Sequence, residues 1–157
     1  MGSIKYFEDF EIGKNFISNS RTITEADIIN FACLTGDFHP IHMDAEFSKT
    51  SFFGERVAHG LLNLSFAMGM INNWEYRSKT MMAFINVNCN FLRPVKINDT
   101  IHGKVSILNK KEWKKPDKGI IVFGLEIINQ RGEIVAKGKL EELVWKKNSK
   151  IYSSRKK

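Results

Sequence analysis

Residues 61–71 have the sequence LLNLSFAMGMI, in which only Asn63 and Ser65 are polar. A helix that is apolar on nearly every side is buried inside a protein, and these eleven residues are too few to span a bilayer. The segment therefore predicts one central helix that other parts of the chain must cover.

The apolar period changes to two after this helix, which is typical of β-strands. Ile, Val, Cys and Phe occupy every second position of residues 85–91, and Arg93-Pro94 then stops the strand. The same alternation returns in residues 101–107, in 121–127 and, after the turn NQRG, in 134–144. Consecutive strands of this kind form an antiparallel meander with one buried face. Together, these strands and the buried helix predict an α+β fold in which a curved sheet wraps the helix.

A second helix is predicted ahead of the central one. Thr24 and Asp27 have the spacing of a capping box, and the helix is expected to end at Gly36. Ala26, Ile29 and Cys33 recur at helical spacing and are expected to form its apolar face. Cys33 and Cys89 are then expected to be buried thiols in a reducing compartment and not to form a structural disulfide.

Composition and charge bound the possible functions. The 157 residues, 43% hydrophobic and 26% charged, predict one globular domain over residues 1–145. The net charge is +7, but residues 146–157 carry six Lys and Arg and no acid, which leaves only +1 for the rest. This segment is expected to be a solvated, flexible tail. No nucleic-acid-binding motif is present in the sequence, so nucleic acid is not an expected partner.

The sequence also bears on localisation. It has no secretory apolar region at its start and no apolar run of membrane-spanning length. A soluble cytoplasmic protein without a membrane partner is therefore expected.

The stretch GDFHPIH, Gly36 to His42, places an aspartate, two histidines and a proline within seven residues. Four interpretations compete for it: a metal site, an acid/base pair, a nucleic-acid contact and an ordinary polar loop. Pro40 fixes one backbone angle and stiffens the loop, which favours a held geometry.

Residues 36–62, GDFHPIHMDAEFSKTSFFGERVAHGLL, closely resemble the signature region of the MaoC-like dehydratases, which include the R-specific enoyl-CoA hydratases. The combination D-x-x-P-x-H followed by A-H-G-L-L carries this resemblance. It implies the hotdog fold, in which a sheet wraps one central helix. It also implies fatty acid metabolism, namely reversible addition of water across the 2,3 double bond of a trans-2-enoyl-CoA to give an R-3-hydroxyacyl-CoA.

The resemblance assigns roles to particular residues. Asp37 and His42 match the acid/base pair that holds the catalytic water, without deciding which of them deprotonates it. Gly60 matches the position whose backbone N–H binds the developing enolate oxygen at a helix start. Ser65 matches a serine that hydrogen-bonds the aspartate, although a hydroxyl bonded back to its own helix is nearly as plausible a role. His59 belongs to the motif and is expected to orient the loop.

The remaining expectations concern the substrate. Its CoA part is expected to enter with the acyl group, so that no separate cofactor is needed. Arg56 and the lysines of residues 110–118 are candidates for its phosphates. The fold usually closes its cleft with a second subunit, so a homodimer or a higher homo-oligomer is expected.

One departure from the family pattern leaves rival functions open. His39 stands where most members have Asn and is placed with the substrate-binding residues. With Asp37, His42 and Asp44 it creates four metal-capable side chains, although hydration requires no metal and none is predicted. The other rivals are a hotdog acyl-CoA thioesterase and a non-catalytic acyl-CoA-binding or regulatory module.

Overall fold

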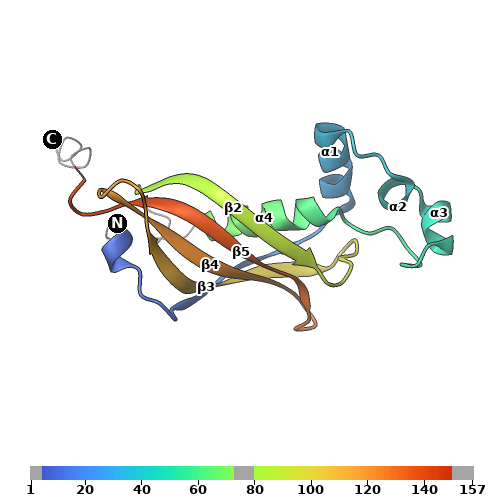
Figure 1. Ribbon diagram of the computed structural model, residues 1–157. Helices are drawn as coiled ribbons and strands as arrows, with labels where there is room; N and C mark the ends of the chain where they lie inside the picture. Colours follow the sequence, from blue (N-terminus) through green and yellow to red (C-terminus); the bar gives the residue numbers. More distant parts are fainter. Residues whose placement is uncertain (1–4, 73–79, 150–157) are drawn as a thin grey trace.

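The computed structural model describes residues 5–72 and 80–149, and its main element is one curved antiparallel sheet (Figure 1). Its strands lie in the order β1-β3-β4-β5-β2, and every neighbouring pair is antiparallel. The strands are β1 (Asn15–Thr22), β2 (Met81–Phe91), β3 (Thr100–Glu112), β4 (Lys118–Asn129) and β5 (Ile134–Trp145). The predicted meander is confirmed for β3, β4 and β5, whereas β2 does not pair with the next strand in sequence, β3, and lies beside β5 at the edge of the sheet.

The strands at the centre of the sheet keep the predicted alternation. Ile101, Val105 and Ile107 of β3 are buried, as are Leu125 and Ile127 of β4. These side chains fill the main core beneath the helix. On β4 the residues of the other face are buried too, because Ile120 and Val122 pack with Leu143 and Trp113 in a second, smaller cluster.

The predicted central helix is α4 (Gly60–Asn72), which lies along the hollow of the sheet and packs against β1, β3 and β4 (Figure 1). Leu62, Ala67 and Ile71 are buried on the sheet side. The side turned away from the sheet is open, since Leu61 is 61% exposed and Ser65 and Gly69 are exposed after it. A single chain thus covers its central helix on one side and leaves a stripe uncovered on the other.

Strand β2 differs from the prediction in its burial. Ile85 and Val87 are 39% and 43% exposed, and Phe84 and Phe91 are also exposed. The reason is its position at the edge of the sheet, where β5 is its neighbour on one side and the other side has none within the described residues.

Helix α1 (Glu25–Thr35) has the predicted ends and a different buried face. The Thr24 hydroxyl accepts from Asp27 N at 3.2 Å, and Gly36 ends the helix in the left-handed conformation at φ 78°. Ile28 and Ala32 point into the core, so the expected face of Ala26, Ile29 and Cys33 is wrong. The expectation of two buried thiols fails for Cys33, which is exposed, while Cys89 is half-buried and both thiols are free.

The ends of the described chain meet at the end of the sheet opposite α1. The short 3-10 helix η1 (Phe7–Asp9) lies there, and Lys147 Nζ is 2.5 Å from Asp9 Oδ1. Lys146 N donates to Asp117 O at 2.9 Å. The boundary at residue 145 and the flexible tail stay predictions, because residues 150–157 lie outside the described residues.

No helix within residues 5–72 and 80–149 is both long enough and apolar enough to cross a membrane.

Candidate active site

The loop after α1 carries the predicted acid/base residues and stands beyond the end of the sheet, near the start of α4 (Figure 1). It leads into two short helices, α2 (Pro40–Met43) and α3 (Ala45–Thr50). The His39 side chain caps α2, because its Nδ1 accepts from Ile41 N at 3.2 Å. Asp37 Oδ1 accepts from His39 N at 3.3 Å. These local bonds hold the loop in the turn that Pro40 begins.

His42 and His59 stack face to face behind this loop. Their ring centroids are 3.8 Å apart with 29° between the planes, and Phe31 of α1 lies 5.1 Å from the His59 ring. His59 is 3% exposed, and its Nε2 lies 3.0 Å from the backbone oxygen of Asp37. His59 therefore ties the residue before α4 to the loop that carries Asp37.

The hydrogen bonds assign the proton positions on both rings. His42 Nδ1 lies 2.7 Å from Val57 O. A carbonyl oxygen can only accept, so the nitrogen that faces it carries the hydrogen: Nδ1 in His42 and Nε2 in His59. In neutral His42 the other nitrogen, Nε2, is then an acceptor that can take a proton.

Burial lowers the pKa of His42 below that of an ordinary histidine. The charges of His59 and His39 act in the same direction, whereas the bond to Val57 O and the Asp37 carboxylate oppose it. The lowered pKa keeps His42 neutral at neutral pH, in the form suited to a general base.

Asp37, His42 and His59 form a compact group in which one ligand atom of each lies within 4.8 Å of the others. The Asp37 side chain is 53% exposed, and its Oδ2 is 4.0 Å from His59 Nε2. This group differs from the four metal-capable residues singled out in the sequence. His39 is committed to capping α2, and Asp44 Oδ1 accepts from Glu46 N and Phe47 N at the start of α3.

Gly60 begins α4 beside this group. The first bond of the helix runs from Asn63 N to His59 O, and the Gly60 N–H has no partner among the residues that the structure describes. A β-carbon at this position would lie 3.1 Å from the Phe91 ring, so the glycine allows this close approach. A pocket of about 320 Å³, here the Gly60 pocket, opens in front of it and is lined by His42, Gly60, Phe91 and mainly apolar neighbours.

Other predicted residues lie apart from this group. Ser65 is exposed, and its Oγ donates back to Leu61 O at 2.7 Å, which is the helix-bonded role. Arg56 Nη2 is 2.6 Å from Glu25 Oε1 and so joins the loop to α1. The lysines of residues 110–118 lie around the β3–β4 turn, at the opposite end of the sheet from α1 (Figure 1). Within one chain they do not reach the Gly60 pocket.

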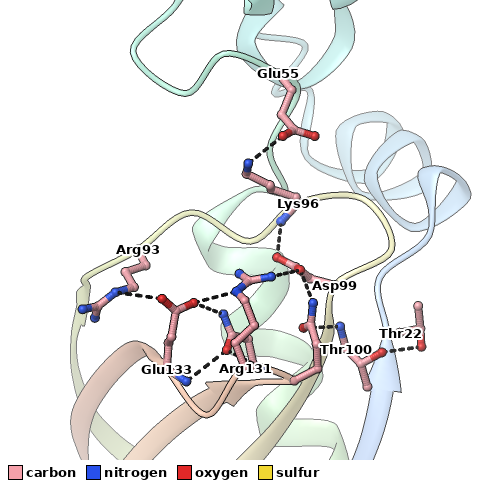
Figure 2. A network of polar contacts seen from close by, with 10 residues as sticks. Thr22, Glu55, Arg93, Lys96, Asp99, Thr100, Arg131 and Glu133 are labelled. Atoms are coloured by element: carbon pink, nitrogen blue, oxygen red, sulfur yellow. Dashed lines mark hydrogen bonds and ion pairs between the residues drawn. The ribbon is translucent and has the colours of Figure 1, made fainter.

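A polar network holds residues 96–99, which directly follow residues 92–95 of the pocket lining (Figure 2). Asp99 is buried, and its Oδ1 accepts from Gln130 Nε2 at 2.6 Å and from Arg131 Nη1 at 2.9 Å. Lys96 connects Asp99 to Glu55. Its backbone N donates to Asp99 Oδ2, and its Nζ lies 2.6 Å from Glu55 Oε1. Desolvation raises the pKa of Asp99, but these hydrogen bonds outweigh it and lower the pKa overall.

Sequence reasoning did not place Asn63 among the site residues. It lies on α4 one turn after Gly60, lines the Gly60 pocket and is 4% exposed. The signal was available, because Asn63 and Ser65 are the two polar residues of the apolar run.

Comparisons with known proteins agree with this architecture. The family model described as MaoC like domain matches residues 9–125. The protein MaoC of Klebsiella aerogenes is 41% identical over 106 residues, which are 68% of this chain. The chain spans only 31% of that longer relative. An (R)-specific enoyl-CoA hydratase from Rhodospirillum rubrum is 28% identical over 90% of this chain and 92% of its own length.

Solved structures show the same fold. A monoamine oxidase regulatory protein from Archaeoglobus fulgidus superposes with a TM-score of 0.88 at 39% identity, covering 91% of this chain and 95% of that one. A Mycobacterium tuberculosis protein described as a double hotdog fold gives 0.80 at 15% identity, over 93% of this chain and 46% of its own. The predicted hotdog fold is confirmed, and the chain belongs to the MaoC-like domain family.

Proposed function

We propose that the protein is an enoyl-CoA hydratase that adds water reversibly to a trans-2-enoyl-CoA and forms an R-3-hydroxyacyl-CoA. Relatives named (R)-specific enoyl-CoA hydratase and 3-hydroxybutyryl-CoA dehydratase support this activity at the level of the family. The observation that carries the proposal is the position of His42, which forms a compact group with Asp37 and also lines an apolar pocket together with Gly60.

The reaction assigns one task to each group. Asp37 and His42 hold a water molecule, one of them removes its proton, and the oxygen bonds to C3 of the enoyl group. Negative charge then moves to the thioester oxygen, where the Gly60 N–H and the positive end of the α4 dipole stabilise it. Delivery of a proton to C2 completes the addition. CoA arrives as part of the substrate, so the proposal includes no separate cofactor.

The thioesterase and the non-catalytic binder would give different observations in one assay. Hydration removes the absorbance of the conjugated double bond, hydrolysis releases a free thiol, and a binder does neither. Residues 60–72 of α4 contain no Asp or Glu that could serve hydrolysis, which favours hydration.

Asp37→Asn tests the assignment directly. This change keeps the shape of the side chain and removes the carboxylate, so kcat/KM for hydration should fall by about 10²–10⁴ while the circular dichroism spectrum is unchanged. A well-folded variant with the turnover of the wild type would refute the role of Asp37.

We also propose that the functional unit is a cytoplasmic homodimer. The exposed stripe of α4 at Leu61, Ser65 and Gly69 is one surface that a second copy can cover. The outer edge of β2, which has no neighbour among the described residues, is another. A partner on this face could also bring the lysines of residues 110–118 toward the CoA phosphates, which one chain alone cannot do.

A further inference from the structure

Asn63 carries an unsatisfied polar group in the Gly60 pocket. Its side chain is buried to 4% exposure, and its Oδ1 has no hydrogen-bond partner among the residues described. A buried amide oxygen without a partner is unfavourable and uncommon in folded proteins. Because Asn63 also lines the pocket, a ligand that enters can supply the missing donor.

The direction of the side chain supports this. Asn63 follows Gly60 by three residues and so lies on the same face of α4. Side chains of a helix lean toward its N-terminus, which places the amide over the turn that begins with the Gly60 N–H. A thioester bound at Gly60 would therefore place its acyl chain beside Asn63.

The other residues that line the Gly60 pocket give no reason for an amide side chain at this position. Ile41, Phe53, Val57 and Val135 give it an apolar lining that suits alkyl groups. Its volume of about 320 Å³ is near the lower end of ligand pockets, roughly 300–1,000 Å³, which favours short acyl chains.

The charges around the pocket favour a neutral substituent. Arg93 at the rim donates from Nη1 to Ile134 O at 3.1 Å, and its Nε is 3.9 Å from Glu133 Oε1. A carboxylate on the acyl chain would have to share Arg93 with Glu133, and it has no hydrogen to donate to Asn63 Oδ1. A hydroxyl can donate to Oδ1 and accept from the amide nitrogen.

On the basis of the proposed hydratase function, we propose that Asn63 selects 2-enoyl-CoA substrates whose short acyl chain carries a hydroxyl group beyond the double bond. The hydroxyl donates to Asn63 Oδ1 and satisfies the buried amide. An alkyl chain of the same length leaves this amide unpaired, so Asn63 discriminates between the two.

Two isosteric substrate pairs test this inference. The first pair is 4-hydroxybut-2-enoyl-CoA and pent-2-enoyl-CoA, and the second is 5-hydroxypent-2-enoyl-CoA and hex-2-enoyl-CoA. In each pair a hydroxyl replaces a methyl group. The wild type should prefer the hydroxylated member of at least one pair by about tenfold or more in kcat/KM. In Asn63→Leu this ratio should shift by about 10–100-fold toward the alkyl member.

A matched control and a stability measurement accompany the kinetics. Asn109→Leu makes the same chemical change at an exposed position of β3 and should keep the ratio of the wild type. Asn63→Leu should melt no lower than the wild type, because it removes an amide that has no partner. A marked fall in melting temperature would assign the amide to the fold and overturn the inference.

The kinetic outcomes separate this inference from the proposed function. If the wild type hydrates the alkyl members as well as the hydroxylated ones, the role of Asn63 is refuted and the hydratase function stands. If it hydrates none of the four thioesters, the proposed function is refuted and the inference is refuted with it.

Discussion

At the scale of single residues, His42 has one ring nitrogen committed to the backbone and one available for chemistry. Its Nδ1–H donates to Val57 O, and burial is the main cause that lowers its pKa below the ordinary 6.5. As the base, His42 is active when neutral, so kcat/KM for hydration should rise with pH through an apparent pKa below 6.5 and then level off.

A pH–rate profile of the purified protein measures this dependence. Activity that falls as pH rises through the same range would instead make His42 the acid, and Asp37 would then deprotonate the water.

The two histidines of the loop should respond differently to substitution. His39 uses Nδ1 to cap α2, which an Asn side chain can do equally well. His39→Asn should therefore keep hydration within about tenfold, whereas His42→Ala removes a proton-transfer group and should lose about 10²–10⁴. Steady-state rates compare the two.

A chelator distinguishes this mechanism from a metal centre built on the same residues. It should leave the wild type unaffected. Inhibition by the chelator, together with about one bound ion per chain by elemental analysis, would place a metal between Asp37, His42 and His59.

At the scale of elements, the polar network of Figure 2 holds residues 96–99, beside the lining of the Gly60 pocket, through one buried carboxylate. Asp99→Asn weakens the bonds from Arg131 and Lys96, so the free energy of unfolding should fall by about 1–3 kcal/mol, as measured by urea denaturation. Because the pKa of Asp99 is lowered in the fold, its stabilisation is present above the unfolded-state pKa and lost as pH falls through the folded one.

Between pH 6 and about pH 3, the free energy of unfolding should therefore fall further in the wild type than in Asp99→Asn. Equal losses in both proteins would show that the ionised Asp99 does not stabilise this segment.

An element could be predicted from the sequence where its apolar and polar side chains alternate regularly. The strands β3, β4 and β5 carry regular alternation and could be predicted, whereas β1, with the sequence NFISNSRT, is mostly polar and exposed and was missed. On α1 the capping residues were predicted correctly, but apolar residues occur on two faces, and the pattern could not show that Ile28 and Ala32 point inward. The residues of the candidate site could be predicted because they form a local motif. The stacking of His42 on His59 could not, because it depends on how the chain folds back to the start of α4.

At the scale of the whole molecule, one feature lay beyond sequence reasoning. An apolar helix predicts burial without saying which chain provides the cover. The sheet covers one side of α4, and the stripe of Leu61, Ser65 and Gly69 is exposed, so that in the proposed homodimer a second copy would cover it. The exposed apolar residues of β2 lie on an edge strand, which has β5 on one side and no neighbour on the other within residues 5–72 and 80–149.

Gly69 gives a test in which a monomer and a dimer respond oppositely. A β-carbon built on Gly69 has no atom of the described residues within 4 Å, and glycine is a poor helix former. If the protein acts as a monomer, Gly69→Leu should raise the free energy of unfolding by about 1 kcal/mol. In the proposed homodimer the leucine would meet the partner across α4, so sedimentation should show monomers and hydration should fall. Gly69→Ala, with a single added carbon, should remain closer to the wild type. A stabilised Gly69→Leu protein with unchanged mass would refute a dimer contact through this face of α4.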